Sequence, residues 1–572
     1  MKMSFAKPHI VKMENLEKPD DGDVYSAASG TVSTHTGFKG HWDSFLDGFQ
    51  RAPPATLEGD NMNKAISKNE LRLMSLSTGL GTGLLVAAGN KLRMAGPAGV
   101  LIAYAITGLI MLVPTICSVS ELSIAYPGLP GGFQSYYSKF IDDSLGFALG
   151  WSYAFQWCCV ISLELVTASM TIKFWTVSVN PDVWVTIFLV VVILVNLGGA
   201  KVYAIAEFFC NSCKVLMLCG FVLFGLIIDV GGGPQGFIGG RYYHDPGAFT
   251  SFKGFASVFV TGAFSLGGSE FISLSAAETR NPRTSIRAAS KLVYVKVIIL
   301  FLGSLTFVGL LVPHNSPELM GSSGNDVHSS PYVLAAELHG VKVLPHIINS
   351  VILISVCSVA IAAMYSSQRL IQSLAHQKLA PKWLDYIDKQ GRPLRAWFLT
   401  VLSSFFAFIA AYDKEETVFN WLLSISGISF VVCWLFICVS HLRFRAALKY
   451  NGISLDTLAY VSPTGVIGSW CSIIINSLIL IAQFWTSLFP EGSPDANNFF
   501  QNYLGAPVML VCFVCHKLYT RNWRLWLPVE EIDVNLDRVI YDPEILELQN
   551  LEEQERYKKA PFWKKILIVC FD

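Results

Sequence analysis

The chain has 572 residues, of which 52% are hydrophobic and only 15% are charged, and its formal net charge is zero. Soluble domains carry about 25% charged residues, so this composition excludes a soluble globular protein. The balanced charge gives no indication that nucleic acid is a partner.

Residues 1–72 are predicted to form a polar, largely disordered cytosolic tail, because they mix Asp, Lys, Gly and Ser without an apolar core. The segment does not have the organisation of a signal peptide. Its short amphipathic stretch Trp42–Phe49 is expected to dock on the membrane surface or on the rest of the protein. The tail also offers lysines to ubiquitin ligase adaptors, namely Lys2, Lys7, Lys12 and Lys18.

Apolar stretches long enough to cross a bilayer recur between residues 73 and 519. A transmembrane helix needs about 20 predominantly apolar residues. We therefore predict an all-α membrane domain over 73–519, followed by a cytosolic C-terminal tail over 520–572. About twelve spans are expected, near 73–90, 97–119, 145–173, 183–200, 204–229, 253–277, 292–312, 344–375, 396–412, 418–440, 467–489 and 503–519.

Basic residues orient these spans, because cytoplasmic loops are enriched in Lys and Arg. The alternate loops hold far fewer basic residues. Lys91 and Arg93 are the exception, because they follow the first span on the side predicted to be outside. Both termini are therefore expected in the cytosol. The basic loops follow the sixth, eighth and tenth spans and contain Arg280, Arg283, Arg287 and Lys291, then Lys378, Lys382, Lys389, Arg392 and Arg395, then Arg443, Arg445 and Lys449.

Glycine clusters interrupt the first and sixth spans at comparable positions, Thr78–Gly83 and Phe264–Glu270. Each glycine costs a helix about 1 kcal/mol, so the clusters indicate unwound backbone. Unwound backbone inside a bilayer is tolerated where it lines a cavity, and paired helix breaks are typical of a transporter's binding site. Close helix packing through small residues is the alternative explanation.

Broken helix ends suit a zwitterionic ligand. The N-terminus of a half-helix offers N–H groups and positive potential to a carboxylate. The carbonyl groups freed on the other half can accept hydrogen bonds from an ammonium group. An amino acid carries both groups on one carbon, so recognition by the backbone leaves its side chain to be selected elsewhere.

Ionisable residues inside the predicted spans include Glu164, Lys214 and Glu270. Each costs about 2.5–3.5 kcal/mol on insertion scales, so a functional role in proton coupling is expected. A buried Lys–Glu pair or a lysine that reaches the interface is the structural alternative. Glu121, Glu207 and Glu278 lie nearer span ends, where an interfacial or loop-bracing role is expected.

A series of short motifs runs along the chain: Gly81-Thr82-Gly83-Leu84, Gly96-Pro97-Ala98-Gly99, Leu163–Ser169, His244–Phe249, Phe264–Glu270, Glu278 with Asn281-Pro282-Arg283, Ala380-Pro381-Lys382, Gly391-Arg392-Pro393 and Phe419–Leu423. In this order, the motifs resemble those of the fungal plasma-membrane amino acid permeases of the amino acid–polyamine–organocation superfamily, with the general, broad-range permeases most similar. The resemblance extends from about Asp43 to the C-terminal tail.

The resemblance implies two inverted five-helix repeats plus two further helices, with proton–amino acid symport into the cell. It implies that the amides around Gly81, Thr82 and Gly83 bind the substrate carboxylate, and that the carbonyls of Gly79, Phe264 and Gly267 bind its ammonium. The Phe264 ring would be a gate. Lys214 would replace a sodium ion, and Glu164 and Glu270 would handle substrate or protons.

The sequence departs from the family pattern at several positions: Ser120 before Glu121, Ile361 and Gln368 on the eighth span, Phe430-Val431-Val432 on the tenth, and Val569-Cys570-Phe571-Asp572 at the end. These changes leave open the substrate range, palmitoylation of Cys570, and a receptor-like role in which the protein senses amino acids with little transport. The other cysteines lie in apolar segments, and no P-loop motif occurs, so no metal, cofactor or enzymatic activity is predicted.

Overall fold

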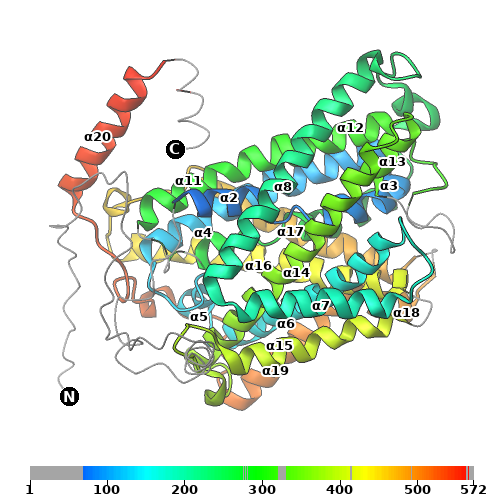
Figure 1. The fold of residues 1–572 in the computed structure, drawn as a ribbon. Helices are drawn as coiled ribbons and strands as arrows, with labels where there is room; N and C mark the ends of the chain where they lie inside the picture. The colour runs from blue at the N-terminus through cyan, green and yellow to red at the C-terminus, as the bar shows by residue number, and fades with distance from the viewer. Residues whose placement is uncertain are drawn as a thin grey trace, which may run out of the picture.

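The computed structural model describes residues 68–319, 330–411, 415–490, 493–561 and 565, apart from 275, 277, 278 and 280. Within these residues, helices joined by loops make up the protein (Figure 1). The predicted surface helix Trp42–Phe49, the N-terminal lysines, Glu278 and Cys570 lie outside the described residues.

Eight helices of the described chain are long and apolar enough to cross a membrane, which confirms the prediction of an all-α, multi-pass protein. A ninth candidate is a pair bent by 72°, α18 (Ala496–Tyr503) and α19 (Gly505–Thr520). Two shorter apolar helices, α7 (Pro181–Leu197) and α15 (Leu394–Ser404), correspond to the fourth and ninth predicted spans.

The helical stretch Gly83–Ala125 is 43 residues long and contains the junction between the first and second predicted spans. Helix α3 (Ala88–Ala105) has non-helical geometry at Gly96, where φ is 76° and ψ is 165°, and Pro97 follows. The chain turns there into the second span, which ends with α4 (Val113–Ala125). Lys91 and Arg93 are therefore helical residues before this turn, and the expectation that they lie in a loop is wrong.

The two predicted helix breaks are confirmed. Helix α2 (Lys68–Ser77) ends before Gly79, whose φ is 84°, and the helix resumes at Gly83. Helix α9 (Phe252–Leu266) ends before Gly268, whose φ is also 84°, and the short helix α10 (Phe271–Leu274) follows. L-residues with a side chain rarely adopt such positive φ values, which explains why glycine occupies both positions.

The broken spans lie at the centre of the bundle. Helix α2 packs against α8 (Gly199–Ile227) and α11 (Pro282–Val295), and α9 packs against α3 and α16 (Glu415–Tyr450). Helix α6 (Asp143–Ile172) packs against α14 (Leu344–His376) and α16 and is the most buried of the candidate spans, whereas α8 and α17 (Gly465–Leu488) are largely exposed.

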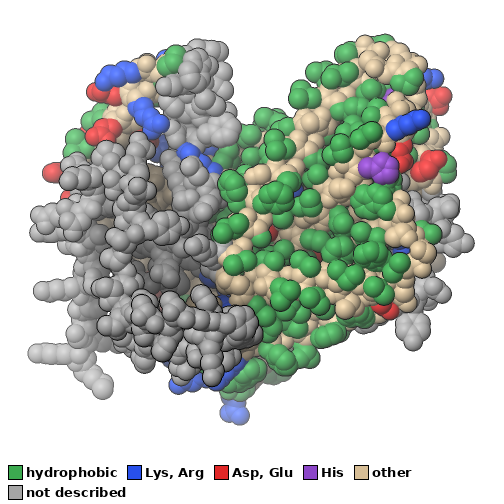
Figure 2. Space-filling model, in the orientation of Figure 1, with side chains coloured by type: hydrophobic (Ala, Val, Ile, Leu, Met, Phe, Trp, Pro, Cys, Tyr) green, Lys and Arg blue, Asp and Glu red, His purple; other side chains and the backbone are tan. Residues whose placement is uncertain are grey.

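The exposed face of the bundle is apolar. In Figure 2, hydrophobic side chains cover most of the described surface, and charged side chains gather toward the two ends of the helices. Exposed residues of α8 such as Ile205, Phe209 and Leu216 contribute to this surface. A wide apolar surface without a protein partner is what a lipid environment requires.

The C-terminal segment after α19 packs on one end of the bundle, beside the loop helix α5 (Phe133–Phe140) and the start of α11 (Figure 1). The Leu527 amide donates to the Ile141 carbonyl at 2.7 Å, and the Val539 amide donates to the Ala125 carbonyl at 2.9 Å. Arg287 of α11 then forms a 2.7 Å ion pair with Glu553 of α20 (Pro543–Lys559). The described part of the predicted 520–572 tail is therefore attached to the bundle.

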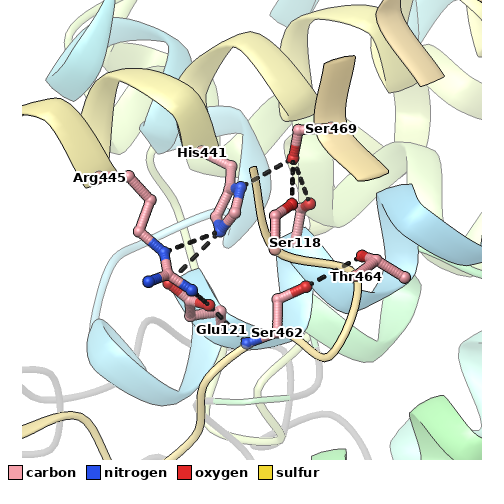
Figure 3. Close-up of polar contacts among 8 residues, drawn as sticks. Ser118, Glu121, His441, Arg445, Ser462, Thr464 and Ser469 are labelled. Atoms are coloured by element: carbon pink, nitrogen blue, oxygen red, sulfur yellow. Dashed lines mark hydrogen bonds and ion pairs between the residues drawn. The ribbon is translucent and has the colours of Figure 1, made fainter. Parts of the chain in front are cut away.

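A buried polar cluster fixes the end of α4 to α16 (Figure 3). The Glu121 carboxylate accepts hydrogen bonds from the Arg445 guanidinium at 2.7 Å and from the Ser462 amide at 2.6 Å. His441 Nε2 lies 3.3 Å from the same carboxylate, and its Nδ1 lies 2.8 Å from the Ser469 hydroxyl. The loop-bracing role expected for Glu121 is confirmed.

Glu121→Ala is expected to lower the stability of the protein by about 3–5 kcal/mol, because the buried Arg445 guanidinium loses its counter-charge. The measurement is the apparent Tm of the detergent-solubilised protein, followed by size-exclusion chromatography after heating. Glu547→Ala on the exposed face of α20 is the matched control and should leave Tm unchanged. Equal Tm values for the two variants would contradict the bracing role.

Candidate functional site

A cavity lies where the two helix breaks meet, and it encloses about 660 Å³ of space, including its opening. The cavity is lined by residues of both breaks together with α2, α6, α8, α14 and α16. All six residues predicted to bind substrate line it, namely Gly79, Gly81, Thr82, Gly83, Phe264 and Gly267.

Glycine is required at the first break because its backbone runs directly against the end of α9. A Cβ atom on Gly79 would lie 2.4 Å from the Ser265 carbonyl oxygen, and one on Gly83 would lie 2.4 Å from the Ser265 hydroxyl oxygen. Both distances are too short for non-bonded atoms. The glycine motif therefore brings two unwound segments into backbone contact.

Backbone groups at the first break are partly engaged with one another. The Gly81 amide donates to the Gly79 carbonyl at 2.9 Å, although these groups were expected to bind opposite ends of a substrate. Thr82 and Gly83 begin the second half of the span, where the N–H groups of a helix lack partners within the helix. The Thr82 and Gly83 amides therefore stand at the start of a helix, whereas the Gly81 amide is engaged within this short turn.

Glu164 of α6 reaches the first break. Thr82 donates its hydroxyl to one Glu164 carboxylate oxygen at 2.5 Å. The second oxygen, Oε1, is buried and has no hydrogen-bond partner among the described residues. A buried acceptor without a partner is costly unless it binds a proton or a ligand. Glu164 therefore has the geometry of a functional group at the cavity wall.

Lys214 of α8 also lines the cavity and belongs to a hydrogen-bonded chain. Its ammonium donates to the Ser358 hydroxyl at 2.8 Å, and Ser358 donates to Glu207 Oε1 at 2.8 Å. Asn211 donates to the other Glu207 oxygen at 3.1 Å. Ser355, one turn before Ser358 on α14, donates to the Leu80 carbonyl at 2.6 Å, which joins this wall to the first break.

The expectation that Glu207 lies at an interface is wrong, because its side chain is buried and lines the cavity. Glu207 precedes Lys214 by about two helical turns, so both side chains lie on the same face of α8. That spacing was the signal in the sequence that could have identified the pair.

Glu270 lies behind the cavity rather than in its wall. Both of its carboxylate oxygens accept hydrogen bonds, one from the Tyr153 hydroxyl at 2.5 Å and one from the Trp434 indole at 3.1 Å. The residue is fully buried and ties the second break to α6 and α16. The structure therefore separates Glu270 from Glu164 and Lys214, with which the sequence grouped it.

Aromatic rings line the part of the cavity beside the second break. The ring centroid of Trp157 lies 4.7 Å from that of Phe271 and 5.8 Å from that of Phe430, and the centroids of Phe264 and Phe430 lie 6.4 Å apart. Among these residues, only Phe264 was predicted to bind substrate. A Cβ atom on Gly267 would lie 2.4 Å from the Phe430 ring, so this ring covers the unwound backbone.

The departures on the eighth span, Ile361 and Gln368, are not among the residues that line the cavity. The Ile361 carbonyl accepts a hydrogen bond from Asn196 of α7 at 3.3 Å, and Gln368 donates to the same asparagine at 3.3 Å. The cavity wall is formed instead by Ser358, Val359 and Ala362. Of the departures discussed, only the one at Phe430 changes the lining of the cavity.

Comparison with known proteins extends over most of the chain. Residues 70–529 match the amino acid permease family. The general amino acid permease AGP1 of Saccharomyces cerevisiae is 49% identical over 519 residues, which cover 89% of this chain and 82% of that protein. The high-affinity glutamine permease of that yeast is 45% identical, with 91% and 80% coverage, and its valine amino-acid permease is 40% identical, with 97% and 98% coverage.

Gly83→Ala is expected to destabilise the protein by about 1–3 kcal/mol, because the added methyl group overlaps Ser265 and the Phe264 ring. The apparent Tm of the solubilised protein measures this effect. Gly220→Ala on α8 is the matched control, since a Cβ atom there meets nothing within 4 Å and its Tm should not fall. A Gly83→Ala protein as stable as Gly220→Ala would show that the backbones do not approach this closely.

Proposed function

The chain belongs to the amino acid permease family, and we propose that it imports amino acids across the plasma membrane by proton symport, with a broad or neutral L-amino acid range. The observation that carries this proposal is the cavity at the junction of the two broken spans. Paired breaks at one cavity are typical of secondary transporters. The names of the relatives, which include a general, a glutamine and a valine permease, support amino acids as the substrates.

Recognition of the substrate divides between backbone and side chains. The N–H groups of Thr82 and Gly83, with Gly81 after its turn opens, bind the carboxylate, and the carbonyls of Gly79, Phe264 and Gly267 bind the ammonium. These groups belong to the main chain and bind the carboxylate and ammonium groups that all amino acids share. The side chain of the substrate then lies against the aromatic wall, with Phe264 as the gate. An uncharged side chain fits such a wall, because a charge buried there lacks a partner.

Coupling to protons is assigned to Glu164, Lys214 and Glu270. Support for Lys214 comes from its position beside the first break, where its ammonium holds Ser358 and the neighbouring Ser355 holds the Leu80 carbonyl. A lysine can lose its charge when buried, so its protonation can control the packing of α8 and α14 against the break. Glu164 supplies a carboxylate with an unpaired oxygen at the same cavity.

Both termini are proposed to lie in the cytosol, on the same side of the membrane as the basic loops. Adaptors of ubiquitin ligases are proposed to act on the two tails. The alternative function is a sensor of amino acids that uses the same cavity but transports little. Transport and sensing differ in whether the ligand accumulates inside the cell.

The proposal is tested by uptake of radiolabelled amino acids in a host that lacks its own permeases. Accumulation should increase at acidic outside pH, because the proton gradient supplies the driving force, and should be abolished by a protonophore. The panel should span apolar, polar, acidic and basic side chains, with the smallest uptake for the charged ones. Specific binding without accumulation, by protein shown to be at the cell surface, would instead support the sensor.

Lys214→Met and Glu270→Gln are each expected to reduce the accumulation ratio to about one, because the proton is no longer coupled to substrate movement. Exchange of internal for external amino acid should persist in Lys214→Met, since the backbone groups that bind substrate remain. The matched control for the lysine is Lys342→Met in an exposed loop, which should accumulate substrate like the wild type. Normal concentrative uptake by Lys214→Met would show that Lys214 has no part in coupling. Normal concentrative uptake by Glu270→Gln would show the same for Glu270.

A further inference from the structure

A second buried lysine, Lys296, lies at the helix breaks and has no role in the function described above. Its side chain is 0% exposed, in the middle of the candidate span Pro282–Leu311. An ammonium group in such a position is costly, and intramembrane charges generally mark functional sites. Lys296 does not line the cavity, but Thr78, one of its two partners, does.

The Lys296 ammonium bridges the two broken spans. It donates to the Thr78 carbonyl at 3.0 Å and to the Ser269 hydroxyl at 2.5 Å. Ser269 in turn donates to the Leu266 carbonyl at 2.8 Å. Thr78 directly follows the last residue of α2, and Leu266 is the last residue of α9. The Lys296 side chain therefore connects the carbonyl ends of both half-helices, that of α2 directly and that of α9 through Ser269.

The charge of Lys296 matches what these two ends present. The C-terminus of a helix carries about half a negative elementary charge, arising from carbonyl groups without partners. Two such ends together carry about one negative charge, which a single ammonium group balances. Buried interactions of this kind are screened little by salt. Glu270, the next residue after Ser269, also interacts electrostatically with Lys296.

We propose that Lys296 is a positioning residue for substrate binding, which holds the ends of α2 and α9 in register so that the carbonyls of the two breaks can accept hydrogen bonds from the ammonium of the substrate. The inference rests on the proposed function only in that the ligand is an amino acid. Lys296 acts from behind the cavity, so its loss should weaken binding of substrates with every kind of side chain to a similar extent. Lys214, in contrast, is assigned to coupling.

The experiment measures the Kd of radiolabelled valine, glutamine and phenylalanine for purified full-length protein. Lys296→Met should increase all three values about tenfold or more, by a similar factor. Ser269→Ala removes one arm of the bridge and should give a smaller increase. Adding Ser269→Ala to Lys296→Met should change Kd little further, because both residues belong to one network. Ile299→Met is the control, on the half-exposed side of the same span, and should bind like the wild type.

Unchanged Kd values in Lys296→Met, or an increase confined to one substrate, would overturn the proposal. If Lys296→Met does not fold, Ser269→Ala decides, and an unchanged Kd in that variant overturns the proposal as well. Uptake is measured in parallel: normal Kd values with a loss of protonophore-sensitive accumulation would make Lys296 a proton carrier instead. Wild-type protein that binds amino acids without accumulating them would contradict the proposed transport but leave this test intact.

Discussion

Unpaired backbone groups at the two helix breaks govern the rest of this structure. Inside a bilayer no water is available to satisfy free N–H and C=O groups, so each group needs a partner from the protein or from a ligand. The structure supplies Ser355 to the Leu80 carbonyl, Ser269 to the Leu266 carbonyl and Lys296 to the Thr78 carbonyl. Within the breaks, the Gly81 amide bonds to the Gly79 carbonyl and the Gly267 amide bonds to the Phe264 carbonyl. All four of these residues line the cavity.

The buried charges follow from the same constraint. Lys214 and Lys296 approach the breaks from different sides, one through Ser358 on the cavity wall and the other directly behind it. Glu164 bonds to Thr82 at the start of the resumed helix, while Glu270 is held by Tyr153 and Trp434. Because each charge has a different degree of hydrogen bonding, these residues are not equivalent. Glu164 has one oxygen without a hydrogen-bond partner among the described residues, whereas both oxygens of Glu270 accept hydrogen bonds.

The membrane class, the helical fold and both breaks could be predicted from the sequence, because long apolar runs and glycine clusters are local signals. The partners of the breaks could not, because they come from helices distant in sequence. Lys296 lies 218 residues from Thr78, and nothing in its own span indicates which face it uses. An interfacial or loop-bracing role was predicted for Glu207 because it lies near a span end, whereas its spacing of seven residues from Lys214 places both side chains on one face of α8. Lys91 and Arg93 were misplaced because the break at Gly96 occurs after them, within one long helical stretch.

The arrangement separates what is common to amino acids from what distinguishes them. Main-chain groups of the two breaks form one part of the cavity, and the rings of Trp157, Phe271 and Phe430 form another part. Ile361 and Gln368 differ from the family pattern but are not among the residues that line the cavity. Phe430 packs against both Trp157 and the Gly267 backbone, and it therefore bears on the range of substrates and on the geometry of the second break at once.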